Sequence, residues 1–459
     1  MLSVRHPPDA DGAGAFYSED DMRNTTTTVV IAAGALLALA RTAVGDVVYV
    51  PDDYPTITAA VEAANQDNEH WTVWVRPGIW PNGISIAKPL LLQSTDGPEV
   101  TTIAESLFSA NSNVEIRGFT FLGGQMTITN GNLVSDCTLS GSKGVFGGAI
   151  SIPSGSPTIE NCRFIGNSAQ SGGGAIYSGN GFPTIIGCDF IDNQAGYGGA
   201  VCFETGDPTD HPLIVNCTFT GNTADLGGAI WNNVTTTIVN SVFFENYSLA
   251  GGGVFNTGPG ISPRLINCTL VDNNALIAGG AMFNEDFSLP VVLNSIFWSN
   301  SASQIHDDLS LTTVKYSLIN FFPGNGNIFG FPDFLDDAGG DLRLLSGSIA
   351  IDAGHNWAIA PHSDTDLDGN PRFAADKNDF DPGCGVPVVV DMGAYEFQGD
   401  PFPVQLGDIT GDGVVGINDF LDLLADWGTC TKDCCLSDLD LDGDVGIADF
   451  LTLLANWTT

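Results

Sequence analysis

The sequence predicts a mostly β fold: a right-handed, single-stranded parallel β-helix that ends in a small α-helical module with two duplicated calcium-type loops. Three observations predict this fold class. A short pattern recurs every 24–29 residues between positions 135 and 300, and such periods are typical of solenoids. The repeat holds short β-branched and aromatic runs broken by Gly, Asn and Pro, without helical periodicity. Near the C-terminus a second pattern occurs twice, at an offset of 30 residues.

Each repeat fits one coil of the solenoid, with three short strands and three bends. Stacked coils rise about 4.8 Å each, so equivalent residues form columns along the solenoid. The repeated segments are SDCTLSG (135–141), ENCRFIGN (160–167), IGCDFIDN (186–193), VNCTFTGN (215–222), VNSVFFEN (239–246), INCTLVDN (266–273) and LNSIFWSN (293–300). A second signal, Gly-Gly-Ala or a close variant, ends at Ala149, Ala175, Ala200, Ala229, Val254 and Ala281.

Two asparagine columns follow from this alignment. Asn tolerates left-handed backbone, and its amide can bond to the coils above and below. We therefore expect both columns to shape bends rather than to carry chemistry, and the Gly-Gly pairs to form a tighter corner. The first column contains Asn161, Asn216, Asn240, Asn267 and Asn294. The second contains Asn167, Asn193, Asn222, Asn246, Asn273 and Asn300.

Residues 46–326 are expected to form the β-helix, and its first coil carries an N-terminal cap. After the strand at Val47, a short amphipathic helix is expected to begin near Thr56, because Ile57, Ala60, Val61 and Ala64 then share one face. Such a helix can cover the open end of a solenoid, which would otherwise expose strand edges.

Residues 1–45 have the pattern of an export signal whose true start is Met22. Arg23 supplies a short positive region, and residues 29–40 form an apolar run that suits a signal peptide. Small residues at 38–40 and 43–45 offer cleavage positions. The alternative is an anchor helix that is never cleaved. Without such an anchor, the mature protein is expected to have no membrane span and to be secreted or displayed on the surface of a bacterial-type cell.

The cysteines mostly fall in one repeat column, where Ser241 and Ser295 substitute for them. Since Ser can replace a buried thiol but not half of a disulfide, we expect stacked core thiols, although neighbouring coils lie close enough for disulfides. The column contains Cys137, Cys162, Cys188, Cys217 and Cys268. A disulfide among Cys384, Cys430, Cys434 and Cys435 is plausible outside the cytoplasm.

The sharpest motif lies at residues 405–459, where two segments begin Asp-x-Thr/Asp-x-Asp-Gly and carry Asp at position twelve. Calcium takes six to eight oxygen ligands, and this spacing supplies them around a Gly turn. We therefore expect two Ca²⁺ sites, each followed by an amphipathic helix that packs on its counterpart. The alternative is a metal-free pair of acidic N-capped helices. The expected ligands are Asp408, Thr410, Asp412, Val414 (through its carbonyl) and Asp419, then Asp438, Asp440, Asp442, Asp444 (through its carbonyl) and Asp449.

A weaker calcium motif lies in residues 327–400, where the repeat fades. Asp364, Asp366 and Asp368 precede Gly369 in a D-x-D-x-D-G pattern, but the twelfth position is Ala375 instead of an acid. These three carboxylates are therefore a second, less complete candidate for Ca²⁺.

Aromatic residues in the repeat indicate a ligand surface. If the residue after each Gly-Gly-Ala motif points into the core, the next one points out; these next residues are Ser151, Tyr177, Cys202, Trp231, Asn256 and Phe283. Exposed Tyr177, Trp231 and Phe283 could stack on sugar rings. The alternatives are that loops cover these rings or that the phase is reversed and they belong to the core.

Several resemblances extend this interpretation. The GGA and FxxN pairs of residues 137–300 resemble the repeats of polymorphic outer membrane proteins, surface β-helices used in adhesion, although we expect no C-terminal membrane barrel here. The first coil is similar to the N-terminal cap of pectate-lyase-like β-helix proteins. Residues 327–400 look like a domain that ends many exported bacterial β-helix proteins before a surface-attachment element. Residues 405–459 are similar to a dockerin, which implies Ca²⁺ and a cohesin-like partner, although Ile417-Asn418 and Ile447-Ala448 replace the usual recognition pair.

Charge and motifs together favour a binding protein. A net charge of -40 disfavours nucleic acid and anionic membranes as partners. We expect a calcium-binding surface or matrix protein that binds glycans or other surface ligands. The alternative is a polysaccharide lyase or glycoside hydrolase on the same fold, although no catalytic residues can be assigned. The acids in the column Gly166, Asp192, Gly221, Glu245, Asp272 and Ser299 recur too irregularly for a catalytic pair and indicate a solvated face.

Overall fold

The structure is a computed structural model, and most of the predicted solenoid is described in it. The described residues are 46–66, 70–81, 83–104, 107–111, 113–204, 211–358, 364–373, 389–398, 407, 409, 414–429, 437, 439 and 444–457. The expected signal region, residues 1–45, lies outside them.

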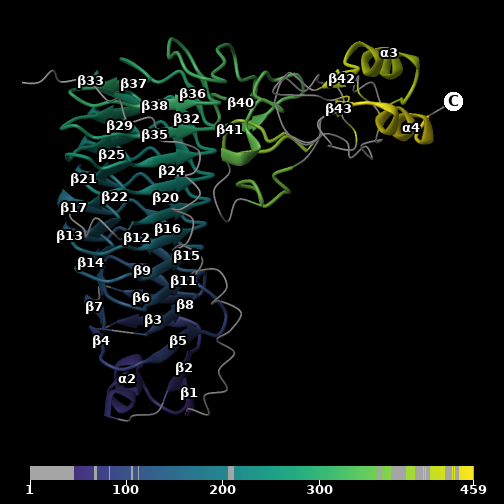
Figure 1. Ribbon diagram of the computed structural model, residues 1–459. Helices are drawn as coiled ribbons and strands as arrows, with labels where there is room; N and C mark the ends of the chain where they lie inside the picture. Colours follow the sequence, from purple (N-terminus) through teal and green to yellow (C-terminus); the bar gives the residue numbers. More distant parts are fainter. Residues whose placement is uncertain are drawn as a thin grey trace, which may run out of the picture. The chain divides into compact units, whose positions relative to one another are not determined.

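Stacked coils form four parallel sheets (Figure 1), with 12, 11, 10 and 6 strands within the described residues. Sheet A contains β1 (Val47–Val50), β2 (Trp71–Val75), β5 (Leu90–Ser94), β8 (Glu115–Arg117), β11 (Leu133–Ser135), β15 (Thr158–Glu160), β19 (Thr184–Ile186), β23 (Leu213–Val215), β27 (Thr237–Val239), β31 (Arg264–Ile266), β35 (Val291–Leu293) and β38 (Thr313–Lys315). Sheet B contains β3 (Gly78–Pro81), β6 (Thr101–Ala104), β9 (Thr120–Leu122), β12 (Thr138–Ser140), β16 (Arg163–Ile165), β20 (Asp189–Ile191), β24 (Thr218–Thr220), β28 (Val242–Phe244), β32 (Thr269–Val271), β36 (Ile296–Trp298) and β39 (Leu318–Ile319).

The other two sheets complete each coil. Sheet C contains β4 (Ile84–Ile86), β7 (Leu107–Ala110), β10 (Gln125–Ile128), β14 (Ile150–Ile152), β18 (Ile176–Ser178), β22 (Val201–Phe203), β26 (Ile230–Asn232), β30 (Val254–Asn256), β34 (Met282–Asn284) and β37 (Ile305–Asp307). Sheet D contains β13 (Lys143–Phe146), β17 (Ser168–Gly172), β21 (Gln194–Tyr197), β25 (Thr223–Leu226), β29 (Tyr247–Ala250) and β33 (Asn274–Ala278). The predicted parallel solenoid is therefore confirmed.

The core consists of inward-facing columns of identical or similar side chains. Phe164, Phe190, Phe219 and Phe243 are fully buried and stack face to face, with ring centroids 4.7–4.8 Å apart and planes within 7°. This spacing is that of the strands themselves, so each ring lies directly over its counterpart in the next coil. The rings contribute apolar burial and mutual stacking at once.

The second asparagine column forms a buried ladder between sheets B and D. Asn222 Oδ1 accepts hydrogen bonds from the backbone N–H and side-chain amide of Asn193, each at 3.0 Å. Its Nδ2 donates to the Phe190 carbonyl at 2.9 Å and to Asn246 Oδ1 at 2.9 Å. Each amide thus bonds to the coils on both sides, as expected from the sequence. Since the ladder is fully buried, every bond replaces one that water would otherwise supply.

The bend between sheets A and B and the bend between sheets B and D each contain a residue with left-handed backbone. Only in the first asparagine column is that residue the asparagine. The first column, between sheets A and B, has it: φ is 52° at Asn161 and 53° at Asn216. At the second bend the left-handed residue precedes the ladder asparagine, and there φ is 54° at Asp192 and 53° at Glu245. The expectation for the second column is therefore corrected. The acids interpreted as a solvated face are bend residues held in this conformation.

The Gly-Gly corner between sheets D and C has two different requirements. The first glycine of the pair, such as Gly198, has φ of 60°. The second, such as Gly199, lies so close to the next coil that a Cβ would be 2.1 Å from the Gly228 carbonyl oxygen. A side chain at the second position would therefore separate adjacent coils.

The capping helix α2 (Ile57–Gln66) forms where the sequence predicts it. Thr56 Oγ1 accepts the Ala59 N–H at 3.1 Å, which caps the first turn. Its buried residues are Ile57, Ala60, Val61 and Ala64, the four expected on one face, and they join the solenoid core.

The cysteine column is a column of free thiols, and Cys202 of sheet C is also free and buried. Burial raises the pKa of Cys268 to about 12, which keeps this thiol protonated and unreactive. The expectation of stacked core cysteines is confirmed for Cys137, Cys162, Cys188, Cys217 and Cys268. Cys384, Cys430, Cys434 and Cys435 lie outside the described residues.

After the last coils, a segment that we call the lateral segment (residues 334–358, 364–373 and 389–398) packs against the outer face of sheet B. It contains the antiparallel pair β40 (Phe334–Asp336) and β41 (Asp341–Leu344) and the short 3-10 helix η2 (Asn356–Ala358). Its residues Leu342, Ile351 and Met392 share an apolar cluster with Phe244 and Val271 of the solenoid. The segment therefore does not continue the stack but covers the side of its final coils.

The C-terminal module contains α3 (Ile417–Ala425) and α4 (Ile447–Ala455), as the repeated pattern predicts, and a short antiparallel pair, β42 (Gly428–Thr429) with β43 (Asp444–Val445). The helices share a small core that includes Leu423 and Leu453. Trp427 and Trp457, which follow α3 and α4, remain 47% and 37% exposed.

The asparagine ladder predicts a large stability loss on truncation. Replacing Asn222 by Ala leaves buried groups of two neighbouring coils without partners, at about 1–3 kcal/mol for each. We expect Asn222→Ala to lower the thermal unfolding midpoint measured by circular dichroism. The exposed Asn274 provides the matched control, and Asn274→Ala should leave the midpoint nearly unchanged. An equal, small effect of both substitutions would contradict the ladder's role.

Candidate functional site

The outer face of sheet C carries a column of side chains in strict register. Ser151 pairs with Tyr177, Tyr177 with Cys202, and Cys202 with Trp231. These residues face away from the core because each follows an inward Ile or Val, and strand side chains alternate between faces. Tyr177 and Trp231 are half-buried, so the predicted phase is confirmed for both rings.

Beyond Trp231, the column expected from the Gly-Gly-Ala motif differs by one residue from the column in the structure. Trp231 pairs with Phe255, whereas the sequence analysis assigned Asn256 to this column. The reason is a triple glycine: Gly253 occupies the alanine position, since the Ala229 N–H donates to its carbonyl at 3.1 Å. Val254 is thus the inward residue of β30.

Asn256 instead belongs to a third asparagine ladder that the sequence analysis missed. Asn232 Nδ2 donates to Asn256 Oδ1 at 3.0 Å, and Asn256 Nδ2 donates to Asn284 Oδ1 at 2.8 Å. All three side chains are fully buried at the ends of β26, β30 and β34. Their common position, two residues after the inward Ile, Val or Met, was the available signal.

Two pairs of aromatic rings lie at the corner between sheets C and D. The Phe146 and Tyr177 centroids are 4.7 Å apart, and those of Tyr197 and Trp231 are 5.8 Å apart. Phe146 is 42% exposed and Tyr197 is 47% exposed, so both pairs are accessible. Phe283 is not: it is only 9% exposed between Phe255 and His306. The three predicted stacking residues are therefore not equivalent.

A polar hollow lies on sheet D beside these rings. Its lining side chains can donate and accept hydrogen bonds. Two of the strands that line it, β13 and β21, also carry Phe146 and Tyr197. The polar lining residues are Lys143, Ser168, Gln170, Gln194 and Asp225. Flat apolar rings next to amide, hydroxyl and charged groups are the combination that carbohydrate ligands require, because sugars present both apolar faces and hydroxyl edges.

The candidate calcium residues of the lateral segment have different environments. Asp366 is buried, and its carboxylate accepts the Asn370 N–H at 2.7 Å and the Glu396 N–H at 3.0 Å. Asp364 and Asp368 are exposed. Although Asp368 is exposed, neighbouring groups take some water from its carboxyl, and this desolvation, together with the charge of Asp366, raises the pKa of Asp368. No group of three or more His, Cys, Asp or Glu side chains suited to a metal occurs among the described residues. Asp366 therefore serves at least to hold the segment's backbone.

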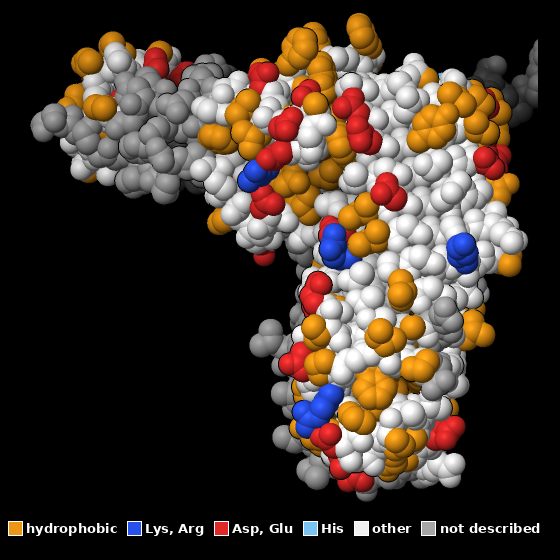
Figure 2. All heavy atoms as spheres, turned by 180° about the vertical axis from the view of Figure 1, so that it is seen from behind, with side chains coloured by type: hydrophobic (Ala, Val, Ile, Leu, Met, Phe, Trp, Pro, Cys, Tyr) orange, Lys and Arg blue, Asp and Glu red, His pale blue; other side chains and the backbone are white. Residues whose placement is uncertain are grey.

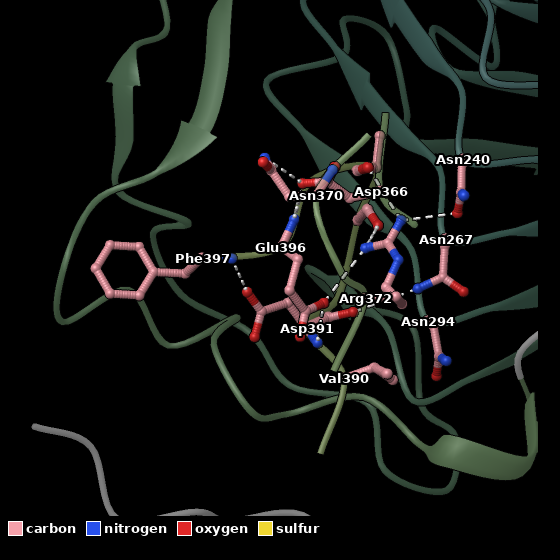
Figure 3. A network of polar contacts seen from close by, with 12 residues as sticks. Asn240, Asn267, Asn294, Asp366, Asn370, Arg372, Val390, Asp391, Glu396 and Phe397 are labelled. Atoms are coloured by element: carbon pink, nitrogen blue, oxygen red, sulfur yellow. Dashed lines mark hydrogen bonds and ion pairs between the residues drawn. The ribbon is translucent and has the colours of Figure 1, made fainter. Parts of the chain in front are cut away.

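Arg372 fixes the lateral segment to the solenoid (Figure 3). Its side chain is fully buried and donates to Asn240 Oδ1 at 2.7 Å and to the carbonyls of Gly393 and Ala394. It also forms a buried ion pair with Glu396, with Nη1 and Oε2 3.5 Å apart. Sequence reasoning missed this residue, because its partners lie up to 132 positions away in the chain.

The first asparagine column supplies the other attachment points. Asn240 Nδ2 donates to the Thr365 carbonyl at 2.8 Å, and Asn267 Nδ2 donates to the Asp391 carbonyl at 3.3 Å. Asn294 exchanges two bonds with the backbone of His355, at 2.9 and 3.1 Å. Three consecutive bends of the solenoid thus bind the lateral segment (Figure 3).

In the C-terminal module, the two position-twelve carboxylates are buried at equivalent places. Asp419 accepts the Gly416 N–H and Asp449 accepts the Gly446 N–H, both at 2.7 Å. Asp449 also accepts the Leu439 N–H at 2.7 Å. The bonds from Gly416 and Gly446 are those of a capping box at the start of each helix, and the bond from Leu439 turns Asp449 towards its own loop. Of the other expected ligands, Val414 and Asp444 are described, and Asp408, Thr410, Asp412, Asp438, Asp440 and Asp442 lie outside the described residues.

The buried Arg372 predicts a local effect on substitution. Removing one partner of a buried ion pair costs about 3–5 kcal/mol. We expect Arg372→Met to increase hydrogen exchange in the lateral segment while the coils before Asn216 keep their protection. Arg343, in an exposed pair with Asp341, is the matched control, and Arg343→Met should have little effect. Equal exchange in the two variants would contradict the anchoring role.

A comparison with known proteins finds a family match within the repeated part of the chain. Residues 161–179 and 216–233 match the Chlamydia polymorphic membrane protein (Chlamydia_PMP) repeat. Both matched segments run from a first-column asparagine through sheets B and D to the strands that carry Tyr177 and Trp231. No curated protein matches the chain. Among the described helices, none is long and apolar enough to cross a membrane. The chain is therefore a parallel β-solenoid with repeats similar to those of this family.

Proposed function

We propose that this is an exported surface or matrix protein whose solenoid binds glycans at the corner of sheets C and D. The observation that carries the proposal is the presence of two accessible aromatic pairs, Phe146–Tyr177 and Tyr197–Trp231, beside a polar hollow. Aromatic faces attract the apolar faces of sugars, and the hollow supplies hydrogen-bonding groups for the hydroxyls. The similarity to repeats of a surface protein family supports the location.

The test is a binding assay on the whole protein with a panel of immobilised polysaccharides in the presence of calcium. We expect Trp231→Ala to weaken binding about tenfold, or roughly 1.4 kcal/mol, because a large anchor ring is lost. Phe321 is fully exposed on a loop after the last coils, and Phe321→Ala should bind like the original protein. Equal binding by all three proteins would contradict this site.

The same incubation distinguishes a binding protein from a polysaccharide-degrading enzyme. Reducing ends or unsaturated products would support a glycoside hydrolase or a lyase, respectively, instead of the binding role. Figure 2 shows one face of the molecule, on which Lys and Arg side chains are few and scattered. A lyase on this fold would need basic groups to neutralise an anionic uronate, and this face offers little support for one.

We further propose that the C-terminal module binds two Ca²⁺ ions and a protein partner, such as a cohesin-like domain. The buried Asp419 and Asp449 support the metal. Both helices also expose apolar side chains at equivalent positions, which supports a partner surface. These side chains are Ile417, Leu421, Leu424, Ile447, Leu451 and Leu454, each 44–69% exposed.

Calcium titration of the full chain by calorimetry tests the metal sites. We expect saturable heat for two ions, and its loss in the double variant Asp419→Asn and Asp449→Asn, because each carboxylate supplies a ligand at position twelve. Asp422 lies exposed on α3, so Asp422→Asn serves as the control and should titrate normally. Absence of saturable heat in the unmodified protein would refute calcium binding.

A further inference from the structure

In the outer column of sheet C, one small side chain lies between two large aromatic ones. Tyr177, Cys202 and Trp231 occupy consecutive strands in register. Cys202 is small and only 3% exposed, whereas the rings of Tyr177 and Trp231 are half-buried and reach the surface. The two rings are therefore separated by two coil rises, roughly 9.6 Å at the strand spacing.

This spacing suits one class of glycan. In an extended β-1,4-linked chain of pyranoses with equatorial linkages, successive sugars are turned over, so every second sugar presents the same face. One sugar advances the chain by about the rise of one coil. A chain that runs along the solenoid axis can thus stack alternate sugars on Tyr177 and Trp231, with the intervening sugar over Cys202.

The column also sets the length of the contact. Beyond Trp231 the column is not accessible to a ligand, because Phe255 and Phe283 are buried under the end of sheet D. In the other direction the column continues as small hydroxyl side chains that are at least partly exposed and can bond to sugar hydroxyls. These are Ser151, Thr127, Ser109 and Ser85, paired in register on β14, β10, β7 and β4. From Ser85 to Trp231 the column spans six coil rises, roughly 29 Å.

Charge restricts the ligand further. The chain carries 54 acidic and 14 basic residues, and Lys143 in the adjacent hollow is balanced by Asp225 in the same lining. A polyanionic chain would therefore be repelled by the molecule as a whole without a compensating basic site here. Resting on the proposed glycan binding, we infer that the ligand is a neutral, extended β-1,4-linked polysaccharide that lies along the solenoid axis and contacts the column through about seven sugars, one for each strand from β4 to β26.

A length series provides the first test. Calorimetry with β-1,4-linked gluco-oligosaccharides of two to about ten units should show affinity that rises with length and levels off near seven. The α-1,4-linked series, whose chain curves, is the matched probe and should bind weakly at every length. Equal affinity for the two series would overturn the inference while leaving the proposed glycan binding intact. No binding of any polysaccharide would remove the proposed function itself.

Added rings give a sharper test of the two-coil phase. Thr127 lies two coils from Tyr177, and Ser151 lies one coil from it. Thr127→Trp adds a ring in phase with the existing pair and should raise affinity for the longest oligosaccharide severalfold. Ser151→Trp adds the same ring out of phase and should not raise it. An equal gain in both variants, with both folded by circular dichroism, would overturn the axial, alternating arrangement.

Discussion

Register between adjacent coils is the constraint on which the structure depends. The solenoid strands are only two to five residues long, so an isolated coil has too few hydrogen bonds and too little apolar surface to persist. Buried Asn193, Asn222 and Asn246 fix the stacking, because each amide finds its partners only when the coils align residue on residue. A slip by one residue would leave these amides unpaired inside the core.

The same register makes the surface periodic. Inward columns become stacks of Phe or Asn, while outward columns repeat at the same rise and are free to vary. The outer face of sheet C carries aromatic and hydroxyl side chains, and the outer face of sheet B binds the lateral segment at its final coils. The high acidic content is compatible with this design, since acids occur at exposed left-handed bends such as Asp192 and Glu245. There a charged side chain stays in water while the backbone turns.

Much of the solenoid could be predicted because its signals are local and repeated. The Asn222 column, the Gly198-Gly199 corner and the apolar face of α2 each follow from rules that act within one coil or one helix. The slip at Gly253 could not be recognised by motif alone, since glycine can replace the small alanine without changing the pattern. Arg372 carries no local signal, because its importance comes from pairing with Asn240, far away in the chain.

Because the lateral segment is attached to Asn240, Asn267 and Asn294, the final coils tolerate the insertion or deletion of a whole coil less well than the earlier coils do. These three bends are successive, and the segment matches their separation. A whole coil inserted or deleted between Asn240 and Asn294 would displace one attachment point by a full rise and disconnect it. The same event before Asn216 would leave all three attachments intact. The protein can therefore vary in length through recombination of its earlier repeats, whereas its final coils are fixed as a unit with the segment they hold.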